Sequence, residues 1–319
     1  MRIASLLPSA TEIVCALGLT ENLVGISHDC DYPPEIRSKP VLSEAIVTTA
    51  LPSGVIDARI REQVHKGKSV YHLDETQLAA LQPDLILTQE LCEVCAPSYT
   101  LVAHAAKVLE GQTKLVSLEP LVVADILETI RMVGTLTGTS ERAHTLVTAL
   151  EARINRVKAT TAGLTPPRVA CLEWLDPVFV AGHWVPEMVE LAGGRDMLGR
   201  PGQPSFVVDW DAVRAAAPEI LILMPCGFDV PRIRDELNLL EQRDGWADLP
   251  AVRTKQVYLT DASAYFSRPG PRIAQGIEIL AAILHPEAFA HTLPPGAFAP
   301  AYGAHARPFP SQPTASPGN

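Results

Sequence analysis

The sequence predicts an α/β protein of two lobes, each with a mainly parallel sheet flanked by helices, joined by a long rigid helix. Three observations support this fold class. Short apolar strands alternate with helical segments over residues 1–120, and the alternation returns over residues 164–287. Such alternation favours parallel sheets. Between these regions, residues 121–163 show no strand signal and carry apolar residues at helical spacing.

The first lobe is predicted to open with a strand, a helix and a second strand. Residues 3–7 are apolar, and a helix then starts at Ser9, with Glu12 completing a capping-box pattern. Gly18 is expected to end that helix. The other elements expected in this lobe are strands over 23–27, 85–88 and 114–118 and helices over 54–66, 75–81 and 99–109.

Two helices are predicted between the lobes, over 122–136 and 140–161. The second would be about 33 Å long at 1.5 Å per residue, enough to cross a whole lobe. The elements expected in the second lobe are strands over 168–173, 177–181, 220–224 and 256–260 and helices over 185–192, 210–216, 230–240 and 271–284. Residues 288–319 are rich in Pro, Ala and Gly and are predicted to form a disordered tail.

Charge and composition argue against several function classes. Lysine and arginine number 26 against 36 aspartates and glutamates, a net charge of −10, which argues against nucleic acid and anionic membranes as partners. No apolar run reaches the ~18 residues that span a bilayer, so we expect no membrane insertion. The start shows no export signal or lipobox, which predicts a cytoplasmic location. Neither a Gly-x-Ser-x-Gly nor a His-Glu-x-x-His motif is present, so we expect a protein that is not an enzyme. We also expect it to be a monomer.

Several segments follow one another in a distinctive order. They are Ser-Leu-Leu-Pro-Ser-Ala-Thr-Glu with Leu-Gly (5–18), Asp-Tyr-Pro-Pro (31–34), Leu-Gln-Pro-Asp-Leu-Ile-Leu (81–87), Ala-Gly-Gly (192–194), Ala-Pro-Glu-Ile-Leu-Ile-Leu (217–223) and Arg-Pro-Gly-Pro-Arg (268–272). This order resembles the cobalamin- and iron-chelate-binding proteins of ABC importers, which are periplasmic binding proteins with a helical backbone.

The resemblance covers residues 2–285 and is strongest to the vitamin B12 binders. It implies a small-molecule ligand, cobalamin or a related corrinoid, held between two lobes whose hinge motion a long helix limits. It also implies an ABC transporter permease as partner and no required cofactor. Members are usually periplasmic or lipid-anchored, so the missing export signal departs from the family.

Candidate ligand-binding side chains follow the ends of predicted strands, where open α/β sheets bind ligands. In Asp31-Tyr32-Pro33 the flanking residues set a turn and the Tyr32 ring would face the cleft, or else pack on the lobe surface. Aromatic rings suit the flat face of a corrin, and polar groups suit its amide rim. The full expected set is Cys30, Asp31, Tyr32, Gln89, Glu173, Trp174, His183, Trp184, Tyr265, Phe266 and Arg268.

Two of these candidates carry open alternatives. His183 lies in a tight Gly-His-Trp loop and would either ligate cobalt or iron, hydrogen-bond a ligand amide, or pack structurally. Arg268 would either meet an acidic ligand group or pair with Asp261.

The segment Cys92-Glu-Val-Cys95 contains a single CxxC motif. With His28 it is a candidate metal site, although a structural zinc site needs further ligands. The alternatives are two ordinary free thiols or a redox pair at a helix start. This cluster supports a second hypothesis, a cytosolic protein that handles a metal or a metallo-tetrapyrrole, or an enzyme.

Overall fold

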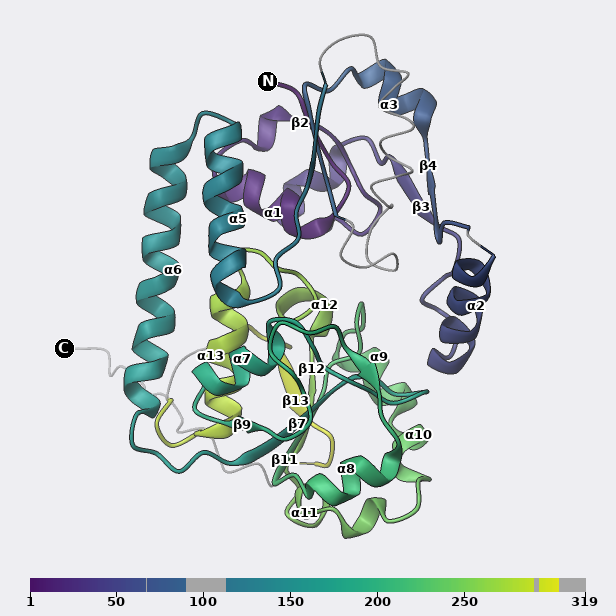
Figure 1. Cartoon of the computed structure of the whole chain (residues 1–319), viewed down its shortest axis with the longest axis vertical. Coiled ribbons are helices and arrows are strands. Elements are labelled where there is room, and N and C mark those ends of the chain that lie inside the picture. Colours follow the sequence, from purple (N-terminus) through teal and green to yellow (C-terminus); the bar gives the residue numbers. More distant parts are fainter. Residues whose placement is uncertain (67, 90–112, 290–292, 304–319) are drawn as a thin grey trace, which may run out of the picture.

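The computed structural model describes residues 1–66, 68–89, 113–289 and 293–303. It has two lobes stacked one above the other, with a column of helices along one side (Figure 1). Both lobes contain a parallel sheet at their centre. The predicted fold class is confirmed.

The first lobe is built on a four-stranded parallel sheet in the order β2-β1-β5-β6. Its strands are β1 (Ile3–Ser5), β2 (Leu23–Ile26), β5 (Leu85–Thr88) and β6 (Lys114–Ser117). Its helices include α1 (Pro8–Ala16), the 3-10 helices Thr20–Asn22 and Pro34–Ser38, and α3 (Glu75–Leu81). Apolar side chains of β1 and β5 fill the core, because both strands are covered on two faces.

Helix α1 differs from the prediction at its start. Leu7 is the extended capping residue and Pro8 is the first helical residue, where the fixed φ of proline suits a helix and its missing N–H costs nothing. No side chain caps this helix, so the predicted capping box of Ser9 and Glu12 is wrong. The Glu12 carboxylate instead meets two arginines of the second lobe.

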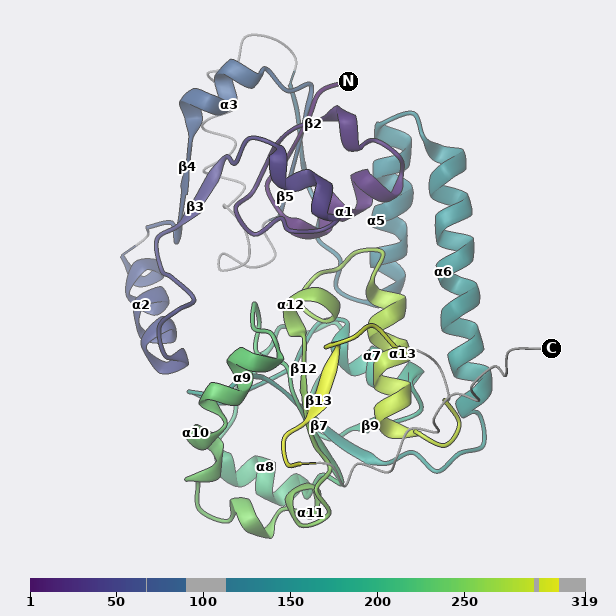
Figure 2. The same ribbon diagram turned by 180° about the vertical axis from the view of Figure 1, so that it is seen from behind.

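A two-stranded ribbon extends from the first lobe. Antiparallel strands β3 (Ser43–Ala45) and β4 (Tyr71–Leu73) form it, and the chain between them carries α2 (Ser53–His65). Figures 1 and 2 both show α2 beside α9 and α10 of the second lobe, on the side away from α5 and α6. We call residues 42–66 and 68–73 the interlobe arm.

Three helices form a strut along the other side: α5 (Val123–Leu136), α6 (Ser140–Thr161) and α13 (Ile273–Leu284). A Cβ added at Gly134 of α5 would lie 2.4 Å from the Ala143 Cβ, so this glycine permits close packing of α5 and α6. Arg153 of α6 donates to both oxygens of Glu278 in α13, at 2.9 and 2.6 Å. One continuous apolar core runs along the strut and into both lobes.

The second lobe is built on a seven-stranded sheet in which β7, β9, β11 and β12 pair in parallel, while β8, β10 and β13 join through antiparallel pairings. The main order is β10-β8-β7-β11-β12-β13, and β9 pairs with β7. The strands are β7 (Arg168–Trp174), β8 (Phe179–Val180), β9 (Arg195–Asp196), β10 (Phe206–Val207), β11 (Ile220–Leu223), β12 (Val257–Thr260) and β13 (Phe298–Pro300). The helices are α7 (Val185–Leu191), α8 (Trp210–Ala216), α9 (Val230–Glu236), α10 (Asn238–Glu241), α11 (Pro250–Arg253) and α12 (Ala262–Tyr265), with a 3-10 turn at Trp246–Asp248.

Strand β13 corrects the predicted tail. Its three residues pair antiparallel with β12, Phe298 opposite Thr260, so the disordered segment predicted from residue 288 is wrong at 298–300. The pairing partner lies about forty positions upstream, beyond the reach of a local composition signal. Residues 304–319 lie outside the described part of the chain. Within that described part, no helix is both long enough and apolar enough to cross a membrane.

Candidate functional site

A cavity of about 430 Å³ lies between the two lobes. Asp31 contributes from the first lobe, and Thr49 and Ala50 contribute from the interlobe arm. The second lobe supplies the remaining wall: Gly227, Phe228, Asp229, Arg232, Asp261, Ser263 and Ala264. These second-lobe residues follow the ends of β11 and β12, the edge at which open α/β sheets bind ligands.

Three carboxylates give the cavity an acidic lining. Asp229 caps α9 by accepting from the Arg232 N–H at 2.9 Å, and Asp261 caps α12 by accepting from the Ala264 N–H at 2.9 Å. Burial raises the pKa of Asp261. Asp31 is half-exposed at the opposite wall.

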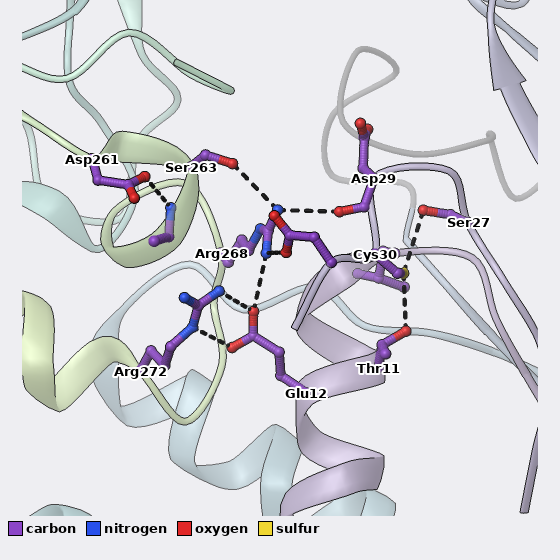
Figure 3. A network of polar contacts seen from close by, with 12 residues as sticks. Thr11, Glu12, Ser27, Asp29, Cys30, Asp261, Ser263, Arg268 and Arg272 are labelled. Atoms are coloured by element: carbon purple, nitrogen blue, oxygen red, sulfur yellow. Dashed lines mark hydrogen bonds and ion pairs between the residues drawn. The ribbon is translucent and has the colours of Figure 1, made fainter. Parts of the chain in front are cut away.

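Arg268 joins the two lobes beside this cavity (Figure 3). Its Nη1 contacts Asp31 Oδ1 at 2.5 Å and Glu12 Oε1 at 3.3 Å. Its Nη2 donates to the Asp29 carbonyl at 3.1 Å and the Ser263 hydroxyl at 3.2 Å. Only 8% of Arg268 is exposed. Its positive charge is matched by two carboxylates of the first lobe, the buried Glu12 and the half-exposed Asp31. The predicted alternative of a pair with Asp261 is replaced by a pair with Asp31.

Arg272 also connects the two lobes, and its guanidinium lies against two tyrosine rings. Its guanidinium donates to both carboxylate oxygens of Glu12, which is buried. The same guanidinium lies 4.4 Å from the ring centroid of Tyr32 and 5.5 Å from that of Tyr265. Cations at such distances are attracted to aromatic faces. Tyr32 remains 45% exposed, so this ring has a free surface at the lobe junction.

Other predicted aromatic residues lie in different surroundings. Trp184 and Phe266 are 7% and 2% exposed, and the Trp184 indole donates to the Phe266 carbonyl at 2.8 Å. Both rings belong to the core, so the expectation that they form open ligand walls is wrong. Trp174 packs on Phe228 at 5.2 Å between centroids and donates to the Ser53 carbonyl of the arm at 3.3 Å.

Glu173 lies in β7, and His183 lies in the loop that follows β8. The Glu173 carboxylate accepts from the Gly182 N–H at 3.3 Å, and burial raises its pKa to about 7. His183 has a left-handed backbone with φ of 50°. Burial lowers the pKa of its imidazole, and its buried Nε2 has no hydrogen-bond partner among the residues described. Neither residue contributes to the cavity wall given above.

The remaining candidates are buried or lie apart from the cavity. The Cys30 thiol is buried, 3.0 Å from the Thr11 hydroxyl, and burial raises its pKa. A neutral, enclosed thiol does not suit the predicted ligand contact. Gln89 is also buried. His28 Nδ1 contacts the Ser43 hydroxyl at 2.8 Å.

The predicted metal site lies partly outside the described residues, because Cys92 and Cys95 belong to the stretch 90–112. Among the residues that are described, no group of three or more His, Cys, Asp or Glu side chains is arranged to hold a metal ion.

Sequence reasoning missed four polar residues at the lobe junction. Asp229 and Arg232 follow β11 closely, so the strand-end rule that selected Arg268 would have found them. The sequence pattern assigns Glu12 to a helix cap and Arg272 to a helix start. Their pairing spans 260 positions, so only the tertiary structure shows it.

Comparison with known proteins places this arrangement in a family. A family described as periplasmic binding protein matches residues 3–264. A Bacillus subtilis chain named as an ABC transporter substrate-binding lipoprotein is 25% identical over 296 residues, covering 90% of this chain and 81% of the relative. The vitamin B12-binding protein of Photorhabdus laumondii is 24% identical over 282 residues, covering 88% and 86%.

A solved structure supports the same fold. The apo form of a periplasmic haem-binding protein from Roseiflexus has a TM-score of 0.67 and 24% identity, covering 90% of this chain and 99% of that one. The family match extends over well more than half of the chain, and its fold is the two-lobed architecture described above. The chain therefore belongs to the periplasmic binding protein family.

Proposed function

We propose that this protein captures cobalamin or a related corrinoid in the cleft between its lobes and delivers it to the permease of an ABC importer. The proposal depends chiefly on the acidic cavity between the lobes, whose wall residue Asp31 directly precedes the exposed Tyr32. The family consists of solute-binding proteins, and relatives named as vitamin B12-binding proteins cover most of the chain. The protein binds its ligand without transforming it.

The charge of the cavity favours a corrinoid over haem. The rim of a corrin carries primary amides, whose N–H groups donate hydrogen bonds, and the carboxylates of Asp31, Asp229 and Asp261 are acceptors. Haem carries two propionates, which the carboxylates of Asp229 and Asp261 would repel, whereas Asp31 is already paired with Arg268. Arg232 is the cation of the wall, and its Nη2 is already paired with Glu236 at 2.6 Å.

The interlobe contacts support a small closure on binding. Glu12 pairs with both Arg268 and Arg272 across the junction, and one apolar core continues through the strut into both lobes. A large hinge rotation would break these buried pairs, which is costly. We therefore expect only a small change in the relative orientation of the lobes when the ligand binds.

Titration with two coloured ligands tests the proposal. Cyanocobalamin and haemin are added to the purified chain while the absorbance spectrum and the heat of binding are recorded. We expect saturable binding of cyanocobalamin at one site per chain and weaker binding of haemin. Tyr32→Ala should weaken cyanocobalamin binding about tenfold or more because it removes an aromatic face. Val207→Ala, at an exposed position on β10 outside the cavity wall, is the control. Tighter binding of haemin than of cyanocobalamin would contradict the assignment.

The cellular location is tested separately. The relatives above are described as a lipoprotein and as a periplasmic protein, and delivery to an importer requires a position on the outer side of the membrane. We therefore propose export, in place of the cytoplasmic location that the sequence predicts. Fractionation of cells that produce the protein, followed by immunodetection, distinguishes the two.

A further inference from the structure

The interlobe arm starts and ends in the first lobe, and its tip reaches the second lobe. At its base, Leu42 and Leu73 are buried in a cluster with Ile86 of the first-lobe sheet. At its tip, Val47 and Ile56 are buried in the core of the second lobe, with Ile60 packed against them. The arm thus reaches from the first lobe to the second on the side opposite the strut, as Figures 1 and 2 show.

Polar contacts hold the tip of the arm to α9. The Ser53 N–H, in the first turn of α2, donates to Glu236 Oε1 at 2.9 Å, and a carboxylate is favourable at a helix N-terminus. Arg232 Nη2 donates to the Leu51 carbonyl at 2.7 Å. The Trp174 indole donates to the Ser53 carbonyl.

The contact between the arm tip and α9, which we call the seam, leaves some polar atoms without a hydrogen bond. Ser53 Oγ, Arg232 Nε and Glu236 Oε2 are buried, and none has a hydrogen-bond partner among the described residues. A buried polar atom without a hydrogen-bond partner is less stable than the same atom hydrogen-bonded to water. Detaching the arm would return these atoms to solvent, so the closed seam is held less firmly than a fully satisfied one.

The seam is physically joined to the ligand cavity. Arg232 holds the arm through Leu51, and its guanidinium lies 4.5 Å from the ring centroid of Phe228 in the cavity wall. Thr49 and Ala50 of the arm form another part of that wall. A ligand in the cavity would therefore contact the arm and the residues that hold it.

The size of the cavity favours movement of the arm. Sites for drug-sized ligands range over about 300–1,000 Å³, and the cavity of about 430 Å³ is near the lower end. A corrinoid is larger than such ligands, and the strut side of the lobes is fixed by a continuous core.

We propose that the interlobe arm is a latch: its tip releases from α9 to admit the ligand and then closes on it through Thr49 and Ala50. The ligand part of this inference rests on the proposed function. The opening of the arm does not, because it follows from the contacts of the free protein.

One substitution is suited to opening the latch. A Cβ added at Gly54 would lie 2.6 Å from Asp176 Oδ2 of the second lobe and 3.4 Å from its Cγ, so the two methyl groups of a valine would crowd this side chain and weaken the contact of α2 with the second lobe. Ala58→Val creates the same side chain one turn later at an exposed position of the same helix. It is the matched control.

Hydrogen exchange of the free protein, read by mass spectrometry, tests the release itself. We expect the amides of residues 47–60 to exchange by local opening in the wild type, while the strut and both sheets stay protected. Gly54→Val should raise the exchange rate of residues 47–60 at least about tenfold, and Ala58→Val should leave it unchanged. Exchange of residues 47–60 only through global unfolding would overturn the proposal.

Stopped-flow mixing with cyanocobalamin and with haemin tests the gating. For whichever probe binds the wild type, Gly54→Val should increase the association rate constant at least about tenfold. An unchanged association rate in a variant whose arm exchanges rapidly would overturn gating. If neither probe binds, the proposed ligand is wrong, and the exchange experiment still decides whether the arm opens.

Discussion

Glu12 of the first lobe accepts two hydrogen bonds from Arg272 of the second lobe, from Nε at 2.9 Å and from Nη2 at 2.5 Å. This paired geometry fixes both groups in one plane and is among the stronger polar contacts in proteins. The pair stands between the strut and the cleft and also supports Tyr32 through the guanidinium face. A specific ion pair thus joins the two lobes at their junction.

Removing the charge of Glu12 should destabilise the protein. Glu12→Gln leaves Arg272 and the buried Arg268 short of a partner, so we expect the free energy of unfolding to fall by about 3 kcal/mol. Urea denaturation followed by circular dichroism measures this. Glu151→Gln breaks the exposed pair with Arg131 on the strut and should cost less than about 1 kcal/mol. Equal losses in the two variants would contradict the role assigned to Glu12.

Glu173 should make stability depend on pH. Its pKa rises from 4.5 to about 7 on folding, so between these values the folded protein holds a proton that the unfolded chain has released. This stabilising contribution is fully present below pH 4.5 and is lost as the pH rises to about 7. Its full size is about 3 kcal/mol.

Glu173→Gln isolates that contribution, because glutamine imitates the protonated carboxyl at every pH. We expect the stability of the variant relative to the wild type to increase by about 3 kcal/mol from pH 4.5 to pH 8. Denaturant titrations at several pH values provide the comparison. A constant difference between the two proteins across this range would show that Glu173 keeps its ordinary pKa.

The acidic cavity wall should select against propionate-bearing ligands. In the double variant Asp229→Asn with Asp261→Asn, both helices keep a capping side chain, since asparagine caps as well as aspartate, while two negative charges disappear. We expect haemin binding to tighten about tenfold and cyanocobalamin binding to change by less than about threefold.

Calorimetric titration of both ligands measures this change in selectivity. Asp74→Asn is the matched control, because Asp74 caps α3 in the same manner, accepting from the Gln77 N–H at 2.8 Å, and does not belong to the cavity wall. Selectivity that moves equally in the control would remove the charge argument for a corrinoid.

Gly182 should be intolerant of a side chain. A Cβ at this position would lie 2.3 Å from the Ser205 nitrogen and 2.5 Å from the Pro204 carbonyl carbon, and backbone atoms cannot move aside easily. We expect Gly182→Ala to lower the free energy of unfolding by about 2–3 kcal/mol. Thermal denaturation compares it with Gly270→Ala, whose new Cβ would have no contact closer than 3.5 Å. Similar midpoints for the two variants would contradict the close approach.

Local signals predicted several elements to the residue. The helix expected over 140–161 is α6, the helix over 75–81 is α3, and the strand over 85–88 is β5. Apolar spacing and the residues that begin and end an element act over one or two turns, so a single stretch of chain contains the information. The helix expected over 230–240 divides into α9 and α10 around Leu237, a break that its apolar pattern does not signal.

The site depends on contacts between distant parts of the chain. The strand-end rule selected Asp31, Tyr32 and Arg268, and the structure brings all three to the lobe junction. The same rule selected Trp184 and Phe266, which the fold buries, because a residue after a strand lies either at the cleft or beneath the neighbouring helix.

The alternation of strands and helices, the long strut helix and the likeness to solute-binding proteins could be read from the sequence, because each depends on short-range patterns of residue types. The arginines that Glu12 meets, the pairing of residues 298–300 with a sheet and the reach of the interlobe arm to the opposite lobe become visible only in the folded chain. These outcomes depend on how two separately patterned lobes pack together, and packing energy is shared among residues far apart in the chain.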